Sequence, residues 1–220
     1  MIAKEIASYD IMPLSTTDTI AYAMNAMDEN NVTHLPLVQD RELVGLISEF
    51  DLVNHPAQAD VVGNVKISLP NAFISSHQHV FDVMKMMTEM KLTVLPVVEQ
   101  RNSYGGLITF QNLVSFLTQN ISVLNPGGLI ILEVAENNYS MAEIAQIVES
   151  NNSRIIGAFF TTRADSTLID ITLKINNTDL NAIIQTFERY NYTIKATFAE
   201  KDDLDDLKER YDALMNYLNI

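Results

Sequence analysis

Hydrophobic residues recur at a helical spacing in two stretches of the chain that lie sixty residues apart. The two sets are Ile20, Met24 and Met27, and Val80, Met84 and Met87. Apolar residues three or four positions apart lie on one face of a helix. The pattern therefore predicts two amphipathic helices, each packing a methionine-rich face into a core.

Each predicted helix is followed by a short apolar run, a polar turn and a second apolar run. The first copy reads LPLV, QDRE and LVGLI, and the second reads LPVV, EQRNS and YGGLI. Two apolar runs joined by a short polar turn are typical of a β-hairpin. A further helix is predicted at SEFDLV in the first copy and at TFQNLVSFL in the second, and a short apolar segment precedes each copy.

The two copies are one duplicated unit with the predicted order strand, helix, strand, strand, helix. Thr33 matches Thr93 at a shift of 60, and Gly45 matches Gly106 at a shift of 61. One residue was therefore added between Gln100 and Gly106, where a hairpin turn tolerates it. A long internal period indicates tandem units that bury their faces against each other, here about residues 1–60 and 61–122.

The rest of the chain changes character after a turn-rich linker at residues 123–127. Strand and helix patterns then follow in the order βαββαβ over residues 128–199, which is the ferredoxin-like arrangement. Ser140, three residues before Glu143, predicts a capping box at the first of these helices. The predicted fold class is therefore α+β, with two βαββα repeats and a ferredoxin-like domain.

Residues 200–220 carry an apolar stripe at heptad spacing. Its members are Leu204, Leu207, Tyr211, Leu214 and Leu218. The spacing predicts an amphipathic C-terminal helix. The stripe could pack on its own subunit or cross to another, and the sequence does not choose between them.

Composition narrows the classes of function. The longest apolar runs fall short of the roughly 18 residues of a membrane span, and no signal-peptide pattern opens the chain, so we expect a cytoplasmic protein. The absence of cysteine excludes disulfides and thiolate metal sites. A net charge of −14 argues against nucleic acid as a partner. The sequence offers no paired nucleophile and base, so we expect neither an enzyme nor a bound cofactor or metal.

One motif carries a resemblance to a known family. Gly45-Leu46-Ile47-Ser48-Glu49-Phe50-Asp51 follows the Leu-Pro strand, and the whole pattern is doubled sixty residues later. This resembles a pair of CBS domains, together called a Bateman module, over about residues 1–122. The region 128–199 resembles an ACT domain, and the combination is similar to CBS-domain proteins of acetoin utilisation.

The resemblance implies an adenosine-containing ligand in the clefts between the repeats. In such pairs the motif aspartate binds the ribose, and Asp51, one turn into a helix, could accept both ribose hydroxyls. Ser48 at the helix N-terminus could donate to a phosphate. The alternative is that Ser48 only caps the helix and Asp51 is a solvated acid of the first turn.

Each predicted cleft draws on both repeats. The better cleft would comprise Leu46, Ser48, Asp51, Asn71, Ala72, Leu92 and Thr93. The second would comprise Ile11, Met12, Val32, Thr33, Leu107, Thr109 and Asn112. We predict that this second cleft is degraded, because an amide offers one neutral acceptor where a carboxylate offers two charged oxygens. His34 could reach a phosphate, or could be a strand-edge histidine.

The sequence therefore predicts a non-enzymatic regulatory protein that senses an adenine nucleotide or S-adenosylmethionine. We expect a homodimer that transmits the ligand signal to an unidentified protein partner, with no membrane or nucleic-acid contact. One alternative is a scaffold with empty clefts. Another is an amino-acid sensor using the ACT-like half, although its AENNYSM loop lacks the glycine that such ligand loops usually carry.

Overall fold

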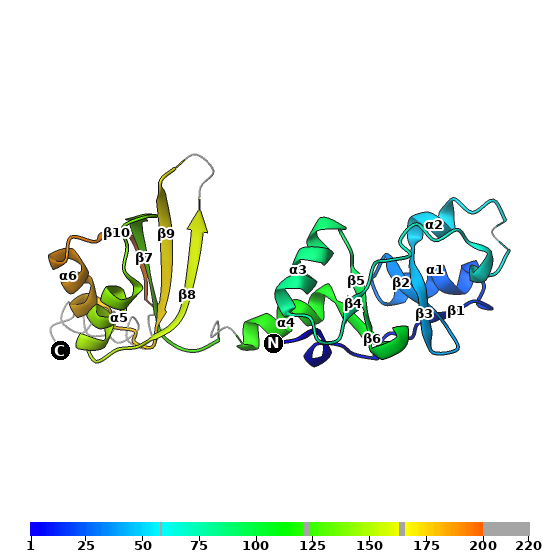
Figure 1. Cartoon of the computed structure of the whole chain (residues 1–220), viewed down its shortest axis with the longest axis horizontal. Coiled ribbons are helices and arrows are strands. Elements are labelled where there is room, and N and C mark those ends of the chain that lie inside the picture. The colour runs from blue at the N-terminus through cyan, green and yellow to red at the C-terminus, as the bar shows by residue number, and fades with distance from the viewer. Residues whose placement is uncertain (58, 121–123, 163–165, 200–220) are drawn as a thin grey trace, which may run out of the picture. The chain divides into compact units, whose positions relative to one another are not determined.

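The computed structural model describes residues 1–57, 59–120, 124–162 and 166–199. The chain divides into two compact units, Met1–Leu117 and Thr118–Ile220, and each is described on its own (Figure 1). The predicted helix at 200–220 lies outside the described residues. So does residue 122, where the first predicted domain ends, and both predictions stay untested.

The first unit contains two three-stranded sheets with the same construction. The first repeat consists of β1 (Leu14–Ser15), α1 (Ile20–Glu29), β2 (His34–Gln39), β3 (Glu42–Ser48) and α2 (Glu49–Val53). The second consists of β4 (Ile74–Ser75), α3 (Val80–Glu89), β5 (Val94–Val98), β6 (Tyr104–Thr109) and α4 (Phe110–Asn120). In each, a short strand runs parallel to the first strand of an antiparallel hairpin. The predicted βαββα order is confirmed twice.

The two hairpins differ at the turn where the sequence repeat gains a residue. In the first hairpin, Gln39 pairs with Glu42 across a two-residue turn. In the second, Val98 pairs with Tyr104, and the longer loop contains a 3₁₀ turn, η3 (Gln100–Asn102). The predicted insertion therefore lies in a turn, where it leaves the strands intact.

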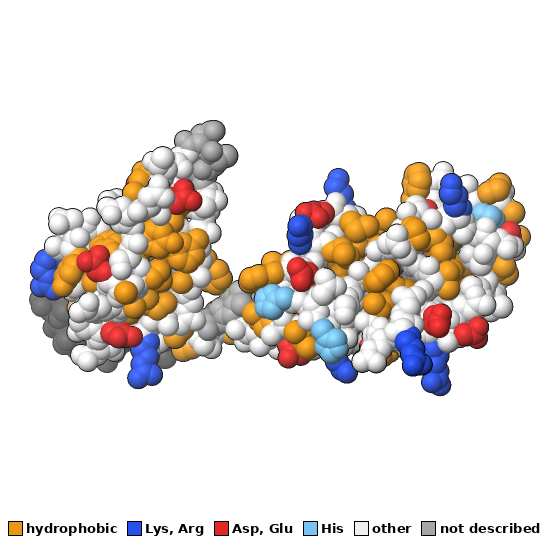
Figure 2. Space-filling view, viewed as in Figure 1, with side chains coloured by type: hydrophobic (Ala, Val, Ile, Leu, Met, Phe, Trp, Pro, Cys, Tyr) orange, Lys and Arg blue, Asp and Glu red, His pale blue; other side chains and the backbone are white. Residues whose placement is uncertain are grey.

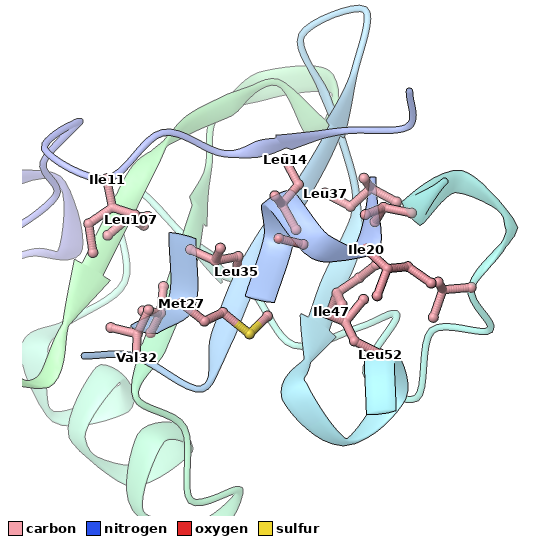
Figure 3. Packing of buried hydrophobic residues seen from close by; sticks show 14 residues of the cluster. Ile11, Leu14, Ile20, Met27, Val32, Leu35, Leu37, Ile47, Leu52 and Leu107 are labelled. Carbon is pink, nitrogen blue, oxygen red and sulfur yellow. The ribbon is translucent and has the colours of Figure 1, made fainter. Parts of the chain in front are cut away.

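Each repeat pairs with the segment that precedes the other repeat in sequence. Ser8, ahead of the first repeat, pairs with Leu107 of the second, while Leu69, ahead of the second, pairs with Leu46 of the first. Two short 3₁₀ turns, η1 (Ala3–Glu5) and η2 (Val62–Asn64), lie in these segments. Figure 3 shows Ile11 and Leu107 in the same cluster of buried side chains. Each core is therefore built from both sequence repeats.

The predicted methionine faces are confirmed in part. Met27 and Met87 are buried, and Met24 packs against the core from its edge. Met84 is 37% exposed, so its predicted core position is wrong. Val83, one residue earlier on α3, is fully buried and occupies the inward-facing position instead.

The second unit has one four-stranded antiparallel sheet. Its elements are β7 (Gly128–Ala135), α5 (Met141–Ser150), β8 (Ile155–Thr162), β9 (Leu168–Ile175), α6 (Asn181–Arg189) and β10 (Thr193–Phe198). The strand order is β10-β7-β9-β8. Both helices lie on the same face of the sheet and share its core (Figure 1). This order and layering confirm the predicted ferredoxin-like fold.

Only one of the two hydrogen bonds of the predicted capping box is present in the described part of this unit. Ser140 Oγ accepts a hydrogen bond from the Glu143 N–H at 3.3 Å, so Ser140 caps α5. The Glu143 carboxylate instead accepts a hydrogen bond of 2.7 Å from the Tyr192 hydroxyl. The glutamate thus links α5 to the start of β10.

Within the described ranges, no helix combines the length and the apolar character needed to cross a membrane.

Candidate ligand cleft between the repeats

Each repeat turns from its last strand directly into a helix, and the two junctions are built alike. At the β3–α2 junction, the Glu49 N–H donates to the Thr33 carbonyl at 2.9 Å. At the β6–α4 junction, the Phe110 N–H donates to the Thr93 carbonyl at 3.2 Å. The motif residues Asp51 and Asn112 each lie in the first turn of the helix that follows.

Asp51 is occupied by hydrogen bonds within the protein. Its Oδ2 accepts from the Ser48 N–H at 3.1 Å, and Ser48 Oγ accepts in return from the Asp51 N–H at 3.2 Å. The hydroxyl and the N–H of Ser68 donate to the same Oδ2, at 3.0 and 3.4 Å. Asp51 is 9% exposed. The two residues form a reciprocal helix cap. Ser48 therefore caps the helix as the alternative prediction had it, but Asp51 is buried and is not the solvated acid of that prediction.

Asn112 uses its amide in the opposite sense. Thr109 Oγ1 accepts from the Asn112 N–H at 3.0 Å, so Thr109 takes the capping role of Ser48. The Asn112 Nδ2 donates to Ser8 Oγ at 3.2 Å. Ser8 and Ser68 lie sixty residues apart, but Ser68 donates to its partner whereas Ser8 accepts. The amide oxygen of Asn112 and the hydroxyl proton of Ser8 are then available for other hydrogen bonds.

A cavity of about 530 Å³ opens at the Asn112 junction. Its lining comes from both repeats: Ser8, Asp10, Ile11, Asn30, Asn31, Val32, Leu92, Thr93, Thr109, Phe110, Gln111 and Asn112. Most of the polar groups are amides and hydroxyls. The volume is within the range of small-molecule sites, and the lining combines apolar walls with neutral hydrogen-bonding groups.

The structure brings together residues from both predicted clefts. Ile11, Val32, Thr109 and Asn112, predicted for the second cleft, line this cavity together with Leu92 and Thr93, predicted for the first. Ser48 and Asp51 do not line it.

The remaining predicted residues lie elsewhere. Leu46, Leu107 and Ala72 are buried in the hydrophobic cores. Met12 is 71% exposed, and Asn71 is also exposed. Thr33 lines a separate cavity of about 380 Å³ that includes Glu49.

His34 joins the two repeats. Its Nδ1 lies 3.0 Å from Thr33 Oγ1 and 3.1 Å from Thr93 Oγ1, and Thr93 in turn lines the cavity. Burial lowers the pKa of His34 below its ordinary value, and the nearby Asp51 carboxylate opposes this shift. Burial thus disfavours the charged form that would attract a phosphate best. Whether His34 contacts a phosphate stays a prediction.

Sequence reasoning missed half of the cavity. The residues it did not name are Ser8, Asp10, Asn30, Asn31, Phe110 and Gln111. Ser8 could have been found, because Ser68 repeats it sixty residues later and each contacts the motif residue at its own junction. Asn30 and Asn31 carry no such signal, since Met90 and Lys91 stand at the matching positions.

Two other kinds of site have little support in the structure. Within the described residues, no three His, Asp or Glu side chains gather as they would around a metal ion. In the second unit, a cavity of about 330 Å³ is lined by residues of α5 and by Tyr190. Amino-acid binding by this unit stays a prediction.

Comparison with known proteins assigns the first repeat to a family. The CBS domain family model matches residues 3–57. The second repeat has the same elements in the same order, so the chain carries a tandem pair of CBS-type repeats.

The curated relatives match about half of this chain. A homoserine O-acetyltransferase from Methanococcus vannielii is 27% identical over 124 residues, which are 53% of this chain and 25% of that enzyme. An inosine-5'-monophosphate dehydrogenase from Methanocaldococcus jannaschii is 26% identical over 115 residues, or 51% and 23%. The chain thus spans about a quarter of the length of these relatives.

Similar solved structures also cover about half of this chain. A CBS domain pair/ACT domain protein from Thermotoga maritima is 18% identical with a TM-score of 0.49, over 54% of this chain and 98% of that one. CBSX2, a CBS-pair protein from Arabidopsis thaliana, has been solved in complex with AMP. It is 22% identical with a TM-score of 0.46, over 54% of this chain and 96% of that one.

Proposed function

We propose that this chain is a non-enzymatic regulatory protein that binds an adenosine-containing ligand between its CBS-type repeats. The observation that carries the proposal is the cavity at the β6–α4 junction, because its lining comes from both repeats. A ligand held there would contact Ser8 and Asn30 from residues 1–60, and Thr93 and Asn112 from residues 61–122. Binding would therefore bias how the repeats pack, and a protein partner would sense that change.

The chemistry of the cavity supports binding rather than catalysis. General acid–base catalysis needs titratable side chains poised beside the reacting atoms. Asp10 is the one acid in the lining, and no histidine or lysine of the described chain accompanies it there. Asparagine, threonine and serine instead provide neutral donors and acceptors, which recognise a base edge or a ribose without activating it.

Thermal unfolding with adenosine, AMP, ATP and S-adenosylmethionine tests the proposal, since a ligand that binds the native state raises the melting temperature. We expect a rise with at least one adenine compound and its loss in Asn112→Ala. The sequence-based preference for the other cleft predicts that Asp51→Ala abolishes the rise instead. No shift with any adenine compound would leave the scaffold as the better account.

We also propose that the chain acts as a homodimer through the helices of its first unit. Large apolar side chains are exposed in the first turn of both α2 and α4, with Phe50 73% and Phe110 58% exposed. Val53 and Val114, which occupy matching positions of the two repeats, are also exposed, one turn further along α2 and α4. Figure 2 shows apolar side chains gathered on the visible face of this unit. Apolar surface of this kind is typical of a contact with another protein.

Light scattering tests dimerisation. The expected mass is twice the 24.7 kDa of one chain. Phe50→Glu should shift the mass toward the monomer, because it places a charge in an apolar interface. Met12→Glu, at an equally exposed residue outside the helices, is the matched control and should remain dimeric. A parent protein that is monomeric across the micromolar range would contradict the proposal.

A further inference from the structure

Among the described residues that line the cavity at the Asn112 junction, one side chain is charged, and that charge is negative. Of the twelve lining residues, Asp10 alone is ionisable at neutral pH. The others present hydroxyls, amides, an aromatic ring and aliphatic walls. Phosphate recognition in proteins normally uses arginine, lysine or a set of unpaired backbone N–H groups. The described side chains that line this cavity include no arginine and no lysine.

The backbone does not replace the missing cations. The first turn of α4 faces the cavity, and a helix N-terminus with unpaired amides would attract an anion. Here the Phe110 N–H already donates to the Thr93 carbonyl, and the Asn112 N–H donates to Thr109 Oγ1. Two of the first three amides of the helix are therefore occupied, which leaves too few to cradle a phosphate.

The nearest basic residue in sequence belongs to the other junction. Lys91 precedes Leu92, which lines the cavity, but the matching residue of the first repeat is Asn31. Asn31 lines the cavity at the β6–α4 junction. The internal symmetry of the repeats therefore assigns Lys91 to the β3–α2 side, where Asp51 lies.

We infer that the ligand of this cavity is an adenosine compound without a phosphate group, and that Asp10 favours a positively charged substituent such as a sulfonium. This inference rests on the proposed function and adds the class of ligand to it. The ribose and base would use the neutral groups around Asn112 and Asn30. Two opposite charges about 4 Å apart in water attract by roughly 1 kcal/mol, so Asp10 should change affinity by about fivefold.

Calorimetric titration with adenosine, AMP and S-adenosylmethionine tests the inference on the full chain. We expect AMP to bind at least about fivefold more weakly than adenosine, and S-adenosylmethionine to bind more tightly than AMP. Asp10→Asn should strengthen AMP and weaken S-adenosylmethionine, each by about fivefold, while adenosine stays unchanged. Asp40→Asn makes the same charge change in the β2–β3 turn, outside the cavity lining, and should alter none of the three affinities.

The outcomes separate this inference from the proposed function. AMP that displaces adenosine with equal or greater affinity overturns the inference, while adenosine binding that is lost in Asn112→Ala still supports the proposed function. An AMP to adenosine ratio that Asp10→Asn leaves unchanged also overturns the inference. If none of the three compounds binds, the inference and the proposed function fail together.

Discussion

The β3–α2 and β6–α4 junctions occupy equivalent positions in the two repeats but use their motif residues differently. Asp51 is buried and holds Ser48 and Ser68 with one carboxylate oxygen. Asn112 holds Ser8 through its amide nitrogen and lies in the wall of a cavity. A carboxylate engaged by three protein donors stabilises the fold, whereas an amide at a cavity wall is available to a ligand.

This difference shows that a sequence motif predicts where a residue lies in the fold more reliably than it predicts the role of that residue. Asp51 matches the motif and Asn112 departs from it, yet Asn112 lines the cavity of about 530 Å³ and Asp51 does not. The helices differ as well, since α2 has five residues and α4 has eleven. At one junction the motif residue is bonded into the interior, and at the other it lies in the wall of a cavity.

Replacing Asp51 should have the largest effect on stability. Asp51→Ala removes a buried carboxylate and leaves the Ser48 N–H and both donors of Ser68 without their acceptor. We expect the free energy of unfolding to fall by about 2–4 kcal/mol. Asn112→Ala, the matched change in the other repeat, loses one amide–hydroxyl bond and should cost about 1 kcal/mol.

Urea unfolding of both variants measures this difference. Equal losses in the free energy of unfolding would mean that the two junctions contribute equally to stability, which would contradict the difference expected from their hydrogen bonds. The result also controls the ligand experiments, because a destabilised Asp51→Ala protein could lose binding without Asp51 touching the ligand.

The serine partners should repeat the contrast at a smaller scale. Ser68→Ala removes a hydroxyl that donates to a buried carboxylate, which should cost about 1.5–3 kcal/mol. Ser8→Ala removes an acceptor of a neutral amide and should cost about 0.5–1.5 kcal/mol. Unfolding in urea compares the two, and a larger loss for Ser8→Ala would contradict the assignment of the charged bond to the Asp51 side.

Ligand affinity offers a third test. Asn112→Asp introduces the carboxylate of the motif, and Ser8 can then donate to it as Ser68 does to Asp51. A carboxylate accepts stronger hydrogen bonds from ribose hydroxyls than an amide does, so we expect adenosine to bind about fivefold more tightly, equivalent to about 1 kcal/mol. Calorimetry measures the change. Unchanged affinity would mean that the new carboxylate is consumed by Ser8, as Asp51 is by Ser68.

Much of the fold could be predicted because its signals are local. The helical spacing around Ile20 and Val80, the Leu-Pro strands and the hairpin turns each specify an element without reference to the rest of the chain. The segment exchange could not be predicted, because local patterns do not say whether Ser8 pairs within its own repeat or with Leu107. The predicted core position of Met84 was wrong for a similar reason, because the spacing of α3 also allows its neighbour Val83 to face inward.

The candidate site was predicted less well, because side-chain hydrogen bonds decide it. The motif identified both junctions, and four residues expected at the second one do line a cavity. It could not reveal that Ser68 engages Asp51, since that contact joins residues 17 positions apart. Asn30 and Asn31 lie outside the motif, so only the three-dimensional structure shows that they line the cavity.

His34 should give the smallest effect and the most specific one, because it lies between the two junctions. Burial lowers its folded pKa below the ordinary 6.5, so below that pH the unfolded chain takes up the proton more readily than the folded one. The free energy of unfolding should therefore fall as the pH drops through 6.5, and level off below the folded pKa.

His34→Gln should remove this part of the acid sensitivity, whereas His77→Gln, at an exposed histidine, should not. Asp51 opposes the shift, so Asp51→Asn should enlarge the loss. Urea unfolding at several pH values between 7.5 and 5 measures each protein, and a His34→Gln variant as acid-sensitive as its parent would show that this histidine does not couple the two junctions to pH.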